Sequence, residues 1–106
     1  MARGRRWRLD EYIICLDLYL RLGPVGNTHP EVIEAAKLIG RTPGAIATRL
    51  GNFQFVDPNR TGPGLGGGER ACQRVWELLA HDPTNTARFS ETAKHLLHEV
   101  AGHQVD

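Results

Sequence analysis

The stretch EVIEAAKLIGRTPGAIATRLGNF, residues 31–53, decides the fold of this chain. Its apolar residues recur at spacings of three and four, a pattern typical of amphipathic helices. Gly40 is expected to end a first helix, because glycine readily adopts the left-handed conformation that follows a helix. Thr42 and Pro43 then fit the N-cap and first turn of a second helix. The buried stripe of that second helix is expected to be Ile46, Leu50 and Phe53.

Two helices joined at a glycine are typical of a helix-turn-helix, in which a small residue lies where the helices cross. Ala36 is the small residue here, four positions before Gly40. Such a pair either binds DNA or is a plain structural hairpin. The side of the second helix away from its apolar stripe is expected to face solvent. It carries residue types that bind phosphates or read bases: Arg41, Thr42, Ala45, Thr48, Arg49 and Asn52.

The rest of the chain also has helical periodicity, interrupted by glycine and proline. A strongly apolar helix is expected over Leu9–Leu22, stopped by the Gly-Pro that follows it. Residues 57–68 are rich in glycine and proline and predict an exposed loop. Two further helices are expected around residues 72–79 and 89–100, the last one closed by Gly102. The sequence therefore predicts one all-α domain, residues 1–106, with about five helices, a helix-turn-helix-like core and a Gly/Pro-rich loop.

Composition excludes several classes of protein. The 106 residues include 13 Lys+Arg and 12 Asp+Glu, and 41% are hydrophobic, which argues against disorder. No apolar run is long enough to span a membrane, and no secretory signal is expected. Cys15 and Cys72 form no Cys-x-x-Cys pair, so two reduced, buried thiols in a cytoplasmic protein are expected. His95, His98 and His103 either bind a metal or are solvated; we expect no metal and no cofactor.

The net charge of the chain is close to zero, but two stretches of the sequence are basic and contain no acidic residue. Residues 1–9 hold four arginines, and residues 35–56 contain no Asp or Glu. Such stretches favour a positive face. Arg5 and Arg6 are therefore candidate DNA contacts, with a disordered basic tail over residues 1–6 as the alternative. Arg60, in the glycine-rich loop, is a further candidate that could reach a neighbouring phosphate.

Several of these motifs together resemble a known family. They are Trp7 and Glu11 at a helix start, LDLYLRL (16–22), HPEVIE (29–34), GRTPGAIATRLGNF (40–53), Asp57-Pro58, and a glycine-rich loop before a helix with Trp76. The combination is similar to the sulfur-binding domain of McrA-like type IV restriction endonucleases, which also carry an HNH nuclease domain. The resemblance implies a recognition domain, itself not an enzyme, for double-stranded DNA whose backbone carries a phosphorothioate. No nuclease core or catalytic triad is recognisable in this chain.

The resemblance also implies a sulfur site built from a proline, its preceding residue and flanking Arg and His side chains. His29, Arg41, Thr42 and Pro43 fit by kind, and Ala45 can add a methyl group. Sulfur is larger and less strongly hydrated than oxygen, so a small apolar cavity suits it, whereas a phosphate oxygen there would lose its water. Plain structural readings are open too: a helix-start proline for Pro43 and an N-cap or loop residue for His29. The alternative functions are a regulator of unmodified DNA, a reader of methylated bases, and a protein-interaction module.

Overall fold

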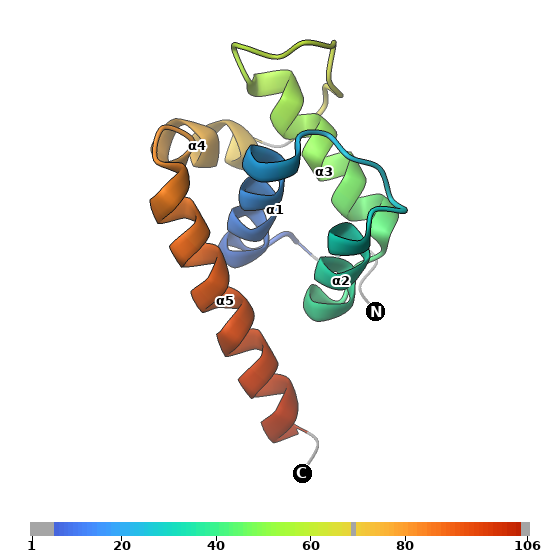
Figure 1. The fold of residues 1–106 in the computed structure, drawn as a ribbon, viewed down its shortest axis with the longest axis vertical. Coiled ribbons are helices and arrows are strands. Elements are labelled where there is room, and N and C mark those ends of the chain that lie inside the picture. Colours follow the sequence, from blue (N-terminus) through green and yellow to red (C-terminus); the bar gives the residue numbers. More distant parts are fainter. Residues whose placement is uncertain (1–5, 69, 105–106) are drawn as a thin grey trace.

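The computed structural model describes residues 6–68 and 70–104, with side chains as far as Val100. It contains five helices: α1 (Leu9–Leu22), α2 (Pro30–Ile39), α3 (Pro43–Val56), α4 (Arg70–Leu79) and α5 (Pro83–Gln104). The expected all-α architecture is therefore confirmed, and the described residues include no strand. Figure 1 shows α1 in the middle, with α2 and α3 beside it, α4 across one end, and α5 running past the body toward the C-terminus.

The fifth helix is longer than the sequence pattern predicted. Its start is fixed at Asp82, whose Oδ1 accepts a hydrogen bond from the Asn85 N–H at 3.1 Å. The side chain of Asp82 thus satisfies a free N–H of the first turn, and Pro83 fits the first helical position. Gly102 was expected to close this helix, but α5 continues through it to Gln104. A glycine inside a helix costs only about 1 kcal/mol, so it does not have to end one.

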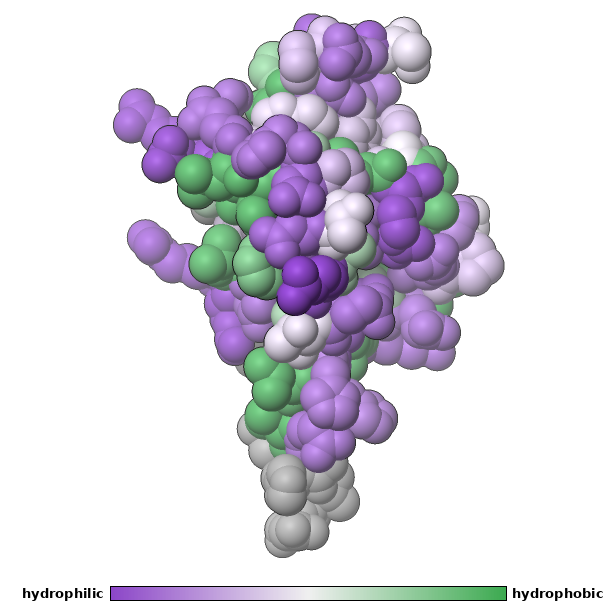
Figure 2. All heavy atoms as spheres, turned by 60° about the vertical axis from the view of Figure 1, so that its left-hand side comes forward, coloured by the Kyte–Doolittle hydropathy of each residue, from purple (hydrophilic) through white to green (hydrophobic). Residues whose placement is uncertain are grey.

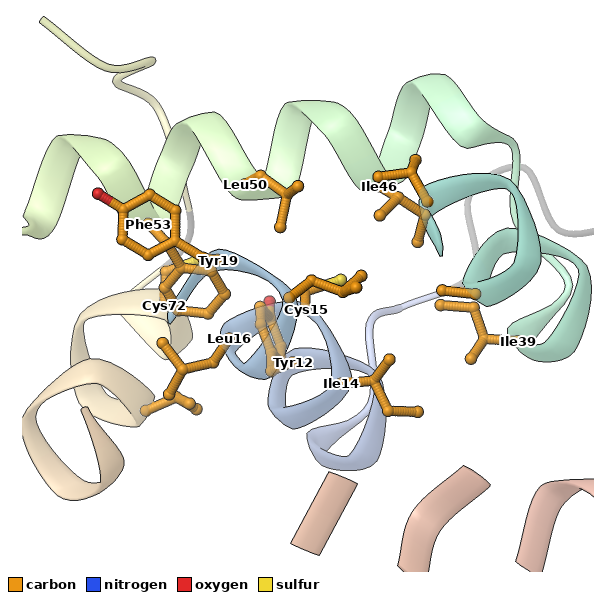
Figure 3. Packing of buried hydrophobic residues seen from close by; sticks show 14 of the residues in the cluster. Tyr12, Ile14, Cys15, Leu16, Tyr19, Ile39, Ile46, Leu50, Phe53 and Cys72 are labelled. Atoms are coloured by element: carbon orange, nitrogen blue, oxygen red, sulfur yellow. The ribbon is translucent and has the colours of Figure 1, made fainter. Parts of the chain in front are cut away.

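The core forms where α1 meets α3. Ile46, Leu50 and Phe53 of α3 are fully buried, as their spacing predicted, and point toward α1 (Figure 3). On the α1 side lie Cys15 and Leu16, both fully buried. Cys15 and Cys72 are both buried and neither is in a disulfide, as expected. Burial raises the pKa of the Cys15 thiol far above its usual range, so this thiol stays protonated and packs as a small hydrophobic group.

The α2–α3 pair has the predicted helix-turn-helix connection. Gly40 adopts a left-handed conformation with φ 74°, and the Arg41 N–H donates to the Ala36 carbonyl at 3.0 Å. Ala36 is buried, which allows the two helices to approach closely. The Thr42 hydroxyl accepts from the Ala45 N–H at 3.1 Å and caps α3. Each of these features reproduces the role that the sequence predicted for that residue.

The glycine-rich loop is anchored on the outer side of α3. The Leu65 N–H donates to the Gly51 carbonyl at 2.9 Å, and the Asn52 side chain donates to the Leu65 carbonyl at 2.7 Å. Gly64 has φ 69°, and a Cβ there would lie 2.5 Å from the Phe55 backbone nitrogen. The loop is exposed over most of its length, as expected, but this segment covers the second half of α3.

Candidate nucleic-acid interface

The start of α3 is partly open to solvent. Thr42 and Thr48 are exposed, and Pro43 and Ala45 are half-buried. Among the described residues, a Cβ at Gly44 would meet only the Thr42 hydroxyl within 4 Å, at 3.9 Å. The first turn of α3 contains no acidic residue. This small, uncovered helix start could admit a phosphate group close to the backbone.

Arg41 does not face solvent, which corrects the expectation for this residue. Only 7% of its side chain is exposed, and its Nη2 donates to Glu11 Oε1 at 2.9 Å. The same nitrogen donates to the Arg6 carbonyl at 2.9 Å, and the guanidinium lies 4.2 Å from the centre of the Trp7 ring. The charge of Arg41 is therefore held between α1 and the segment that precedes it. In this arrangement it fastens the N-terminal segment to the helix-turn-helix.

Arg49 and Asn52 are also buried, although both were expected on the outer face. The Arg49 guanidinium lies 4.3 Å from the Trp7 ring centre and 5.1 Å from that of Tyr12. Its Nη1 donates to Asn52 Oδ1 at 3.2 Å. The expectation failed because the side of α3 away from Ile46 and Leu50 is not bare. The Trp7 segment covers it around Arg49, and the glycine-rich loop covers it around Asn52.

His29 lies at the other end of α2 from the start of α3. It is the N-cap of α2, and its Nδ1 accepts from the Glu31 N–H at 3.1 Å. The ten residues of α2 separate it from Gly40, about 15 Å at the usual helical rise. The structure thus brings Thr42, Pro43 and Ala45 together but leaves His29 apart from them, in the N-cap role that was its structural alternative.

Two of the remaining candidate cations, Arg6 and Arg60, lie at the surface. The Arg60 guanidinium lies 5.0 Å from the Phe55 ring centre and donates to the Phe55 carbonyl, so it folds back over the C-terminal end of α3. Arg6 is exposed, close to Arg41 through its carbonyl. Arg5 lies outside the described residues. Arg6 and Arg60 are thus on the surface, at opposite ends of α3.

Trp7, Glu11 and Tyr12 are the residues of this region whose roles the periodicity did not reveal. One signal existed for Glu11: it stands three residues after Arg8, as in a capping box, and its Oε1 accepts from the Arg8 N–H at 2.9 Å. No local signal places Trp7 against two arginines from α3 and its N-terminal flank, because this contact spans more than thirty residues of chain.

The described residues hold no group of three His, Cys, Asp or Glu side chains suited to a metal ion. His95 and His98 are exposed on α5. None of the helices in the described part of the chain is both long and apolar enough to cross a lipid bilayer. Comparison with protein-family models, with curated proteins and with solved structures finds no match for this chain.

Proposed function

We propose that this chain recognises double-stranded DNA carrying a phosphorothioate, with the start of α3 as the contact to the modified phosphate. The observation that carries the proposal is the partly exposed turn Thr42–Ala45, which follows the helix-turn-helix connection and has no acidic residue. Pro43 has no N–H and the Ala45 N–H is hydrogen-bonded to Thr42, so the Gly44 N–H and the positive end of the helix dipole are what favour an anion here. In a phosphorothioate, sulfur replaces one phosphate oxygen, and the other oxygens of the group would contact this helix start.

Selectivity for sulfur would come from the apolar atoms beside it. The ring of Pro43 and the methyl groups of Thr42 and Ala45 offer a small carbon-lined surface. Sulfur loses little hydration against such a surface, whereas an oxygen of an ordinary phosphate loses a hydrogen bond to water and gains no donor. In this proposal Arg41 does not contact the DNA; its contacts with Glu11 and Trp7 hold the start of α3 in place. His29 has no part in the site.

The resemblance of the sequence extends the proposal to a biological role. The chain would serve as the recognition module of a modification-dependent type IV restriction endonuclease, acting on DNA in the cytoplasm. Recognition is then its contribution, and cleavage belongs to an HNH nuclease domain. The competing function is a helix-turn-helix regulator that reads unmodified DNA through the same helix.

Binding to matched duplexes with and without one phosphorothioate tests the proposal. We expect the sulfur duplex to bind at least tenfold more tightly. Pro43→Ala should lower that preference severalfold, corresponding to about 1 kcal/mol for the apolar ring atoms that the substitution removes. Its matched control is Pro83→Ala, a proline at the same helical position of α5. Equal binding of both duplexes would favour the regulator, and no binding to either would exclude both functions.

A further inference from the structure

A large apolar groove lies on the side of the molecule formed by α1, α4 and α5, and no residue of α3 lines it. It has a volume of about 1050 Å³ and runs along α5, bordered by α4 and the first turns of α1. Leu78, Leu96 and Val100 are each more than half exposed along it. Figure 2 shows hydrophobic side chains reaching the surface on this side and toward the projecting end of α5. Exposure of so much apolar surface to water is unfavourable, so the groove is expected to bind a partner molecule.

The apolar residues of α5 define which partner fits. Phe89, Ala93, Leu96 and Val100 line the groove at spacings of four, three and four. That is the spacing of a seam between two packed helices. When two such helices pack antiparallel, Phe89 can face Val100 of the other helix while Ala93 faces Leu96. Both pairs share the same midpoint, between residues 94 and 95, so one two-fold axis satisfies both.

The charges beside this seam agree with the same axis. Arg88 and Glu99 are exposed on one flank of the stripe, and neither has an ion-pair partner within the described part of its own chain. In an antiparallel pair, residues on the same flank of the two helices lie opposite one another. Arg88 lies two residues farther from the midpoint than Glu99, about 3 Å along the helix, which these long side chains can span, so each Arg88 would reach the Glu99 of the other helix. The symmetry forms this pair twice.

We propose that the groove binds a second copy of this chain, through an antiparallel α5–α5 contact about a two-fold axis near residues 94 and 95. Two features indicate a copy of the same helix as the partner. Arg88 and Glu99 have opposite charges, and the small Ala93 faces the larger Leu96 in the same antiparallel register. The proposal does not rest on DNA binding, because no residue of the turn Thr42–Ala45 lines the groove.

Sedimentation of the purified chain over a range of concentrations tests the association. We expect a monomer–dimer equilibrium, which Leu96→Glu weakens at least tenfold. His98→Glu is the matched control, since it adds the same charge on the other side of α5 and should leave the dimer intact. Circular dichroism checks that both variants fold. A monomer at every concentration, or a dimer equally strong in Leu96→Glu, would overturn the proposal.

A charge exchange then tests the antiparallel register. Arg88→Glu and Glu99→Arg should each weaken the dimer severalfold, because each places like charges opposite one another. The double variant should restore it to nearly the original strength. Failure of the double variant to restore dimerisation would show that these helices do not pack in this register.

Discussion

Arg49 and Thr48 are neighbours in α3 with opposite surroundings. Arg49 is 9% exposed and contacts Trp7 and Asn52, whereas Thr48 is exposed. A buried cation held by an aromatic ring and an amide contributes to stability through those contacts, and removing it also leaves a void. Substitution of Arg49 should therefore affect mainly the stability of the fold, and substitution of its neighbour Thr48 mainly the proposed DNA binding.

We expect Arg49→Ala to lower the free energy of unfolding by about 2–4 kcal/mol. Urea denaturation followed by circular dichroism measures this change. Thr48→Ala should alter stability by less than about 0.5 kcal/mol, because surface substitutions have small effects. In the proposed function it should nevertheless weaken DNA binding. A stable Arg49→Ala protein that loses DNA affinity would instead make this arginine a DNA contact.

At the scale of elements, one exposed ion pair, Arg21 with Glu31, joins α1 to α2, and Arg21 also pairs with Asp17 inside α1. Arg21 Nε donates to Asp17 at 3.1 Å, and its Nη2 donates to Glu31 at 2.9 Å. The hydrogen bond from Arg21 lowers the pKa of the Glu31 carboxyl. A carboxyl whose pKa is lower in the folded state stabilises the fold above its unfolded pKa, and this contribution is lost as the pH falls through the folded value.

We expect Glu31→Gln to reduce the loss of stability on acidification below about pH 5, where free glutamate begins to protonate. The effect at neutral pH should be at most about 0.5 kcal/mol, because the pair is largely exposed. Urea unfolding at a series of pH values measures it, with Glu34→Gln on the same helix as the control. Identical pH profiles for wild type and Glu31→Gln would contradict the role of this pair.

The glycine-rich loop is held to α3 by the shape of its backbone. Gly64 and Gly67 both have positive φ, 69° and 85°, but only Gly64 is pressed against α3. Gly64→Ala should therefore lower the free energy of unfolding by about 1–3 kcal/mol more than Gly67→Ala does, since a Cβ at Gly67 meets no described atom within 4 Å. Thermal unfolding of the two variants gives the difference. Equal costs would mean that the loop can leave α3 without penalty.

At the scale of the whole molecule, the sequence revealed the helices better than their surroundings. Apolar spacing and caps are local, so α1, the turn at Gly40 and the cap at Thr42 could be predicted from neighbouring residues. The burial of Arg41, Arg49 and Asn52 depends on segments distant in the chain. A helical pattern shows which side carries apolar residues, but it does not show whether a tryptophan or a loop covers the other side.

Arg6, within the basic N-terminal run, lies beside the start of α3, because its carbonyl accepts a hydrogen bond from Arg41. If the arginines before it contact DNA, deleting residues 1–5 should weaken binding strongly at low salt and little at high salt. The slope of log affinity against log salt should fall by about one for each phosphate that the shortened chain no longer neutralises. Titrations at several salt concentrations measure the slope, and an unchanged slope would assign these residues no part in binding.

In the proposed function, the loop that covers the second half of α3 would limit how many base pairs this helix can contact. The uncovered stretch from Thr42 to Thr48 is about 9 Å long at the helical rise, which matches fewer than three base-pair steps of about 3.4 Å. A three-letter sequence recurs by chance about every 64 base pairs of random DNA, far too often to single out a site. If the proposed function holds, one copy with so short a footprint would gain little selectivity from base order, and a chemical mark on the backbone would supply information of another kind.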